Sequence, residues 1–118
     1  MFEKAQAFFE KARKLPEIHE IDQTVQFRLS DDNIFYVRVE DGKISVSNGE
    51  TTPDFWNVLN IQTNKKTIND ILDGRLTLGE AILEERLKVL EMAKKPVIAW
   101  FGRIIRKTQQ DVPKPLKT

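Results

Sequence analysis

The residues of this sequence that could carry chemistry are one histidine, two pairs of adjacent acids and a basic C-terminal end. His19 is the only histidine and the chain has no cysteine, so a metal site or a Ser-His-Asp arrangement would depend on His19 or on carboxylates alone. The pairs Asp31, Asp32 and Glu84, Glu85 could act as an acid and a base, but they stand where a turn and an exposed helix end are expected. The five glycines are scattered singly, so no glycine-rich phosphate loop exists. We therefore expect no catalytic site, no metal and no cofactor.

The charge is distributed unevenly along the chain. Before Lys94 there are 12 basic and 17 acidic residues, a net charge of −5, whereas from Lys94 onward there are seven basic residues and one acid, a net charge of +6. A basic end of this kind could contact an anionic membrane surface, although a solvated basic helix face is the commoner meaning of a charge run. Exposed aromatic residues are not interleaved with these charges, so nucleic-acid binding is not expected.

Length and composition predict one domain. The 118 residues are 40% hydrophobic and 31% charged, which is ordinary for a globular protein. No apolar run approaches the roughly 20 residues that would span a bilayer, and the start lacks the pattern of a secretory signal. We expect a cytoplasmic protein with a single domain over residues 1–110. Pro113 and Pro115 rule out a continuing helix, so residues 111–118 should form a loose tail.

Alternation of apolar and polar residues predicts a run of short strands. The strands are expected at 24–29, 34–40, around 44–46, at 59–63 and at 86–91, and the pair Asp41-Gly42 favours a tight hairpin. Residues 50–57 are less regular, because Pro53 interrupts them and Phe55-Trp56 should be exposed at that edge. Helices are expected at the two ends and in one insertion between strands. The predicted class is therefore α+β, with a five-stranded, mainly antiparallel sheet.

Residues 65–92 carry the strongest local signals. Asn64 is a plausible cap for a helix that contains Ile68 and Leu72 at helical spacing. Asp73-Gly74 should end this helix, because glycine accepts the left-handed backbone just past a helix terminus. Thr77 and Glu80 stand three residues apart in a capping-box arrangement at the start of a second helix.

Both terminal segments read as amphipathic helices. In the first, Phe2, Phe8 and Phe9 fall on one side, and Pro16 should end the helix. The last helix should begin at Pro96, a residue favoured in the first turn. Its apolar residues recur at i, i+3, i+4, i+7 and i+8, namely Val97, Trp100, Phe101, Ile104 and Ile105.

The order of motifs resembles a known family. Gly74-Arg75-Leu76, then Ala81, then Leu87-Lys88-Val89 is similar to the signature of the sterol carrier protein type-two (SCP-2) family of small lipid-binding domains, and the resemblance covers about residues 20–107. It departs at Glu85 and Glu91, where the family usually has glycine, and Pro53 to Trp56 looks like a short insertion.

The resemblance implies non-catalytic binding and carriage of a sterol, fatty acid or fatty acyl-CoA in a hydrophobic cavity between sheet and helices. The residues expected to line that cavity are all apolar: Phe27, Phe35, Val37, Ile68, Leu72, Ile82, Trp100, Phe101, Ile104 and Ile105. In sequence alone, a residue that lines a cavity and a residue that packs a solid core look the same. Each of the ten residues is therefore explained at least as well by packing in a solid core as by contact with a ligand.

The sequence is also compatible with two other functions. The apolar faces of the terminal helices could meet another chain, which would make the protein a partner-binding module or a homodimer. An enzyme would require a titrating group in a cleft, for which His19 is the first residue to replace.

Overall fold

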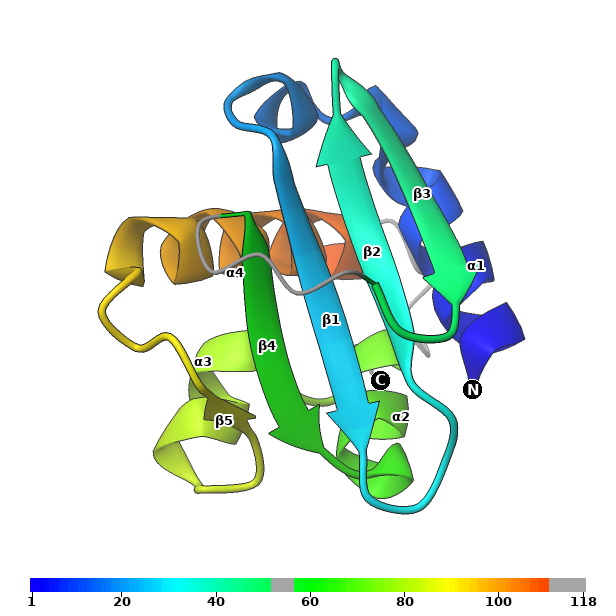
Figure 1. Ribbon diagram of the computed structural model, residues 1–118, viewed down its shortest axis with the longest axis vertical. Coiled ribbons are helices and arrows are strands. Elements are labelled where there is room, and N and C mark those ends of the chain that lie inside the picture. Colours follow the sequence, from blue (N-terminus) through cyan, green and yellow to red (C-terminus); the bar gives the residue numbers. More distant parts are fainter. Residues whose placement is uncertain (52–56, 111–118) are drawn as a thin grey trace, which may run out of the picture.

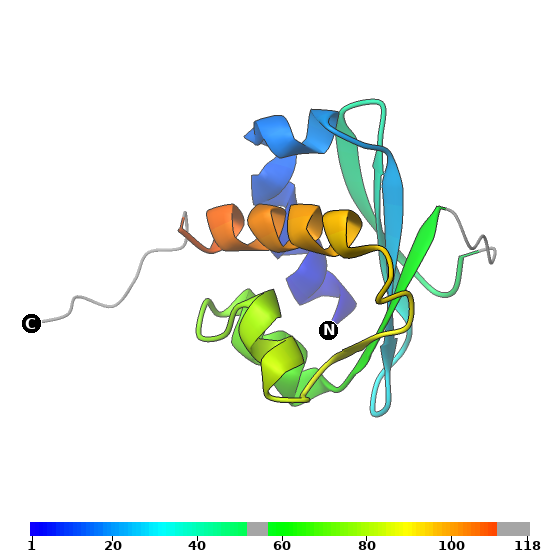
Figure 2. The same ribbon diagram turned by 90° about the vertical axis from the view of Figure 1, so that its left-hand side faces the viewer.

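The computed structural model describes residues 1–51 and 57–110. Within them the fold has two layers: a five-stranded sheet, and helices that cover one of its faces (Figures 1 and 2). The α+β class is confirmed. The predictions for Pro53 to Trp56 and for the tail at 111–118 lie outside the described residues.

The sheet is mixed. Its strands are β1 (Gln23–Leu29), β2 (Phe35–Glu40), β3 (Lys43–Asn48), β4 (Val58–Thr63) and β5 (Lys88–Val89), and their order is β3-β2-β1-β4-β5. β1 pairs in parallel with β4, with Val25 opposite Leu59, and the other three pairings are antiparallel. The expectation of a mainly antiparallel sheet is thus confirmed.

The last strand is shorter than predicted. The pattern at 86–91 predicted six residues, whereas β5 has two. The main-chain N–H of Arg86 donates to the oxygen of Ala81 in the preceding helix, so Arg86 belongs to the turn and not to the sheet.

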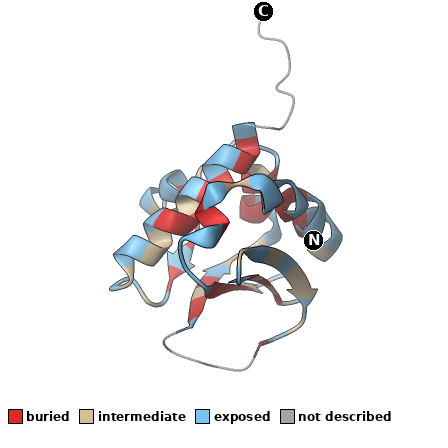
Figure 3. Cartoon of the chain, turned by 90° about the horizontal axis from the view of Figure 1, so that it is seen from above, coloured by how far each residue is buried: buried red, intermediate tan, exposed pale blue. Residues whose placement is uncertain are grey.

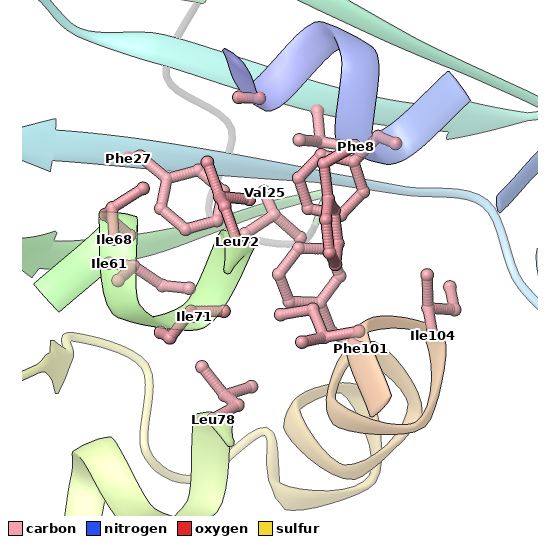
Figure 4. Close-up of a cluster of buried hydrophobic side chains, with 14 of the residues drawn as sticks. Phe8, Val25, Phe27, Ile61, Ile68, Ile71, Leu72, Leu78, Phe101 and Ile104 are labelled. Atoms are coloured by element: carbon pink, nitrogen blue, oxygen red, sulfur yellow. The ribbon is translucent and has the colours of Figure 1, made fainter. Parts of the chain in front are cut away.

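The two faces of the sheet differ in polarity. Val25, Phe27, Val37 and Ile61 are almost completely buried. Val25, Phe27 and Ile61 lie beneath the helices (Figure 4), and Figure 3 shows buried residues on both the strands and the helices. On the other face, Gln26 donates to Asn60 Oδ1 at 2.9 Å and accepts from the N–H of Thr51 at 2.8 Å. The described end of the β3–β4 connection is therefore fastened to the polar face.

The hairpin between β2 and β3 has the predicted turn. Asp41 and Gly42 have φ of 52° and 71°, as a two-residue turn of this kind requires, and Glu40 lies opposite Lys43. The ring of His19 lies directly against Gly42, in the place that a Cβ atom there would occupy. His19 therefore contacts the turn between β2 and β3. The sequence had indicated only that it lies in the connection after the first helix.

The N-terminal segment is divided. The helix α1 (Phe2–Glu10) is followed by two 3-10 turns, η1 (Lys11–Lys14) and η2 (Pro16–His19). The prediction that Pro16 ends the first helix needs correction, because the α-helix ends at Glu10 and Pro16 begins η2. Phe8 and Phe9 are buried, as expected, and the ring of Phe9 stacks on that of Phe101 with centroids 5.8 Å apart.

Both middle helices have the predicted caps. In α2 (Lys65–Leu72), the Asn64 side chain accepts from the N–H of Thr67 at 2.9 Å. In α3 (Leu78–Leu83), Thr77 and Glu80 form the complete capping box. Gly74 has φ of 78° and lies just past the end of α2.

A cluster of ion pairs holds α2 to the segment before β5. Arg86 donates to Asp70 Oδ2 at 2.6 Å, and Arg75 donates to Asp70 Oδ1 at 3.0 Å. These two guanidinium groups, Arg86 first, lower the pKa of the Asp70 carboxyl to about 2. The cluster fixes the chain on both sides of α3.

The last helix, α4 (Lys95–Gln110), crosses the helical layer and has Pro96 in its first turn, as predicted (Figure 1). Trp100, Phe101, Ile104 and Ile105 are each no more than 2% exposed. The indole Nε1 of Trp100 donates to the main-chain oxygen of Glu17 at 2.7 Å, which fastens α4 to η2.

Candidate ligand-binding groove

Nine of the ten residues predicted to line a cavity lie in the core between the sheet and the helices. Phe27 and Phe35 stack with ring centroids 4.8 Å apart. The ring centroid of Phe101 lies 6.0 Å from that of Phe27, and both residues are labelled in Figure 4. All nine are buried: Phe27, Phe35, Val37, Ile68, Leu72, Trp100, Phe101, Ile104 and Ile105. The structure brings these residues together as a packed core, and their contact with a ligand stays a prediction.

Ile82 differs from the other nine. It is only partly buried, and it lies in an open groove of about 310 Å³ between α3 and α4. The floor and walls of this groove are mostly apolar, with two arginines among the lining residues. The residues are Thr77, Leu78, Gly79 and Ile82 from α3 and the turn before it, and Ile98, Ala99, Gly102, Arg103 and Arg106 from α4.

Small residues create the groove. Gly79 and Ala99 are exposed, and a Cβ atom at Gly79 would have no neighbouring atom within 4 Å. A Cβ atom at Gly102 would come to an ordinary contact distance of 3.8 Å from Leu78, so the two helices are close to each other there. Because these positions lack bulky side chains, Ile82 and Ile98 remain partly exposed between the two helices.

A second hollow adjoins the α3–α4 groove at Ile82. It measures about 360 Å³ and is lined by Ile82, Glu85, Leu87, Lys88, Val89 and Met92. Met92 is 45% exposed. Apolar surface therefore continues from Ile82 in the groove to Met92, which follows β5 in the chain.

A third hollow adjoins the groove at its other end and is polar. It measures about 410 Å³ and is lined by Gly74, Thr77, Glu80, Arg106, Gln109 and Gln110. Thr77 and Arg106 line both this hollow and the α3–α4 groove. The three hollows thus follow α3 from a polar end at Arg106 to an apolar end at Met92.

Part of the positive charge of α4 is paired. Arg103 donates to Glu20 Oε1 at 2.8 Å, and Lys107 donates to Glu17 Oε2. Glu17 is buried, and the hydrogen bond from Lys107 lowers the pKa of its carboxyl. The basic end predicted from the sequence therefore includes two residues that hold α4 to the η2 region.

Sequence reasoning named Ile82 but missed the other groove residues. The available signal was the set of small residues Gly79, Ala99 and Gly102 on two predicted helices. Hydrophobicity patterns do not detect such positions, because a glycine or alanine contributes space and not apolar surface.

Within residues 1–51 and 57–110, no group of three or more His, Cys, Asp or Glu side chains could hold a metal ion.

The comparisons with known proteins agree on the class of domain. The chain belongs to the SCP-2 sterol transfer family, whose model matches residues 2–90. α4, with one side of the groove, lies beyond the matched residues. No match was found among curated proteins.

Solved structures of this family share the fold at low sequence identity. The sterol carrier protein domain 2 of Helicoverpa armigera has a TM-score of 0.69 and 15% identity, over 95% of this chain and 91% of that one. A crystal structure of sterol carrier protein 2 has a TM-score of 0.67 and 16% identity, over 96% of this chain and 98% of that one. In both cases nearly the whole domain corresponds.

An enzyme contains a similar domain. A double mutant of the sec-alkyl sulfatase PisA1 has a TM-score of 0.56 and 20% identity over 69% of this chain. The chain spans only 12% of that sulfatase, so the likeness concerns a small part of the enzyme.

Among the described residues, no helix is both long and apolar enough to cross a membrane.

Proposed function

We propose that this protein binds and carries an apolar ligand, a sterol, fatty acid or fatty acyl-CoA, without making or breaking a bond. The observation that carries the proposal is the apolar groove between α3 and α4, in a chain that belongs to the SCP-2 sterol transfer family. Neither the groove nor the adjoining hollow at Met92 contains a histidine, a cysteine or a pair of facing carboxylates. Apolar burial is the chemistry these surfaces offer.

The shape of the groove favours an elongated ligand. The α3–α4 groove and the hollow at Met92 each have the volume of a small-molecule site, about 300 Å³ or more, and they adjoin at Ile82. A flexible acyl chain could lie along both. Each Å² of apolar ligand surface removed from water contributes about 25 cal/mol, so a chain that covers both hollows binds more tightly than one confined to either.

The nine core residues would contact a ligand only if the helices moved away from the sheet. Their rings and branched side chains contact one another, so a ligand between the layers would have to replace these contacts. A ligand in the α3–α4 groove displaces no core side chain. The proposal therefore places the ligand beside Ile82, with the nine residues supporting the groove from behind.

The test uses a bulky residue in the groove. Gly79→Phe puts a ring into open space, and Gln62→Phe adds the same ring on the opposite, exposed face of the sheet as a matched control. Binding of a fluorescent fatty acid is measured for all three proteins, together with native mass spectrometry of lipid retained during purification. We expect Gly79→Phe to weaken binding at least about tenfold and Gln62→Phe to leave it unchanged.

Two results would contradict the proposal in different ways. If the wild-type protein carries no lipid and takes up none of the fluorescent fatty acids and sterols offered, the carrier function is wrong. If the wild-type protein binds but Gly79→Phe binds equally well, the ligand lies elsewhere, and the space between sheet and helices becomes the site to test.

A second candidate is a partner-binding or homo-oligomerising module. The observation in its favour is the exposure of three large apolar side chains: Leu83 is 84% exposed, and Leu90 and Met92 are each 45% exposed. Scattered exposed apolar residues are normal, but these three fall within residues 83–92 and could meet another chain. The same native mass spectrum tests this function. A dimer that disappears in Leu83→Glu would support it, and a monomer at all concentrations would overturn it.

Contact of α4 with an anionic membrane surface is a further part of the carrier proposal. Lys95 and Arg106 are exposed on α4, whereas Arg103 and Lys107 pair with Glu20 and Glu17. The charge left for a membrane is therefore smaller than the sequence indicated. Co-sedimentation with vesicles that contain phosphatidylserine, weakened by salt, would support this contact, and equal binding to neutral vesicles would count against it.

A further inference from the structure

Arg106 stands at the boundary between the polar and apolar hollows along α3. It lines the polar hollow together with Glu80, Gln109 and Gln110, and it lines the α3–α4 groove together with Ile82 and Ile98. An amphiphile has the same division, with a polar group at one end of an apolar chain. A ligand whose chain lies along Ile82 toward Met92 would therefore place its polar end at Arg106.

Arg106 forms no salt bridge within the described part of the chain. Within residues 1–51 and 57–110, no carboxylate lies within 4 Å of its guanidinium nitrogens, in contrast to Arg103, which pairs with Glu20. Glu80 lines the same polar hollow, and its Oε1 accepts from the N–H of Thr77 at 2.9 Å. This backbone hydrogen bond, followed by a hydrogen bond with the Thr77 side chain, lowers the pKa of Glu80, and the charge of Arg106 adds a smaller effect.

The neighbouring polar side chains are fixed in other contacts. Gln109 Nε2 donates to the main-chain oxygens of Ile71 at 2.9 Å and Leu76 at 2.8 Å. The Thr77 side chain accepts from the N–H of Glu80 at 3.1 Å and also hydrogen-bonds to the Glu80 carboxylate. Arg106 is therefore the cation that this end of the groove offers to an anion, with the exposed amide of Gln110 in the same hollow.

We propose that Arg106 forms a headgroup subsite that selects an anionic amphiphile with one long acyl chain. The inference rests on the carrier function proposed above and narrows its ligand class, because a neutral sterol has no group that uses the guanidinium charge. The planar guanidinium suits a carboxylate or a phosphate equally, since it can donate two parallel hydrogen bonds to either. The shared chemistry is thus an anionic oxygen group at the end of an acyl chain.

The experiment compares charged and neutral ligands of equal chain length. Oleate, monooleyl phosphate and oleyl alcohol are titrated into the wild-type protein by calorimetry, below the concentration at which each aggregates. The variant is Arg106→Gln, and the control is Lys95→Gln, which removes one positive charge from an exposed site of α4 outside the hollows. Circular dichroism confirms that both variants are folded.

We expect Arg106→Gln to weaken oleate or monooleyl phosphate binding by about tenfold or more, because charge-assisted hydrogen bonds are lost, and to change oleyl alcohol binding less than about twofold. Lys95→Gln should change none of them by more than about twofold. The anion whose binding is weakened more by Arg106→Gln identifies the preferred headgroup.

The failures of the two proposals are distinguishable. If all three ligands bind and Arg106→Gln weakens none, or weakens the alcohol as much as the anions, the headgroup subsite is wrong and the carrier function stands. If no ligand with an oleyl chain binds to the wild-type protein, the headgroup subsite is wrong, and the carrier function falls as well if a fluorescent sterol also fails to bind.

Discussion

Trp100 and Glu17 are joined across 83 positions of the chain by a hydrogen bond of 2.7 Å, from the indole Nε1 to a main-chain oxygen. Lys107, two turns further along α4, donates to the buried carboxylate of the same Glu17. α4 is therefore fastened at two points to the 3-10 turn η2. Because α4 forms one side of the proposed groove, these contacts hold that side in place.

The first prediction concerns the indole donor. In Trp100→Phe the hydrogen bond is lost and a smaller ring stands in a buried site, so we expect the free energy of unfolding to fall by about 1–3 kcal/mol. Urea unfolding followed by far-ultraviolet circular dichroism measures this difference. A free energy of unfolding within about 0.5 kcal/mol of wild type would show that the contact is not needed to hold α4.

The second prediction concerns pH. The pKa of Glu17 in the folded protein is lowered below its ordinary value of 4.5, chiefly by the hydrogen bond from Lys107. The carboxylate therefore stabilises the fold fully above pH 4.5, and this contribution is lost as the pH falls through the lowered folded pKa.

Urea unfolding from pH 7 to pH 3 tests this linkage. Glu17→Gln keeps the side-chain shape but cannot titrate, so the stability of the wild-type protein should approach that of the variant as the solution is acidified. Lys107→Met should also remove much of the pH dependence. A constant difference between wild type and Glu17→Gln across the whole range would rule out the contribution of this pair.

The third prediction uses a departure from the family pattern. Glu85 stands where the family usually has glycine, and its φ of 58° lies in the left-handed region that disfavours side chains with a Cβ atom. We expect Glu85→Gly to raise the free energy of unfolding by about 0.5–1 kcal/mol, since relief of strain exceeds the added freedom of the unfolded chain.

Glu85→Ala is the matched control, because alanine removes the carboxylate but keeps the backbone strain. It should give no comparable gain. If Glu85→Ala and Glu85→Gly stabilise the protein equally, the effect arises from the carboxylate and not from the backbone.

Local structure could be predicted because it depends on residues close together in the sequence. The Asn64 cap, the Thr77–Glu80 capping box and the Asp41-Gly42 turn each involve residues at most three positions apart. Their chemistry is the same in any fold that allows the helix or the hairpin. Predictions for long elements were less complete, since β5 keeps two of six expected residues and α1 ends before Pro16.

The candidate site could be predicted only in part. Ten apolar residues were expected to line a cavity, and nine of them pack against one another, because burial favours contact among apolar side chains whether or not a ligand is present. The tenth, Ile82, lies in the groove. The other groove residues depend on how α3 and α4 approach each other at Gly102, and no sequence period encodes that distance.

Residue type and short spacing were enough to predict the α+β class, the helix caps, the hairpin and the likeness to the SCP-2 family. Three features emerged only from the folded structure: β4 lies parallel to β1, Glu17 and Trp100 meet, and small residues on α3 and α4 leave an apolar groove with Arg106 at its polar end. These features arise from contacts between segments far apart in the chain. Such contacts are fixed when the layers pack, and not by any one segment.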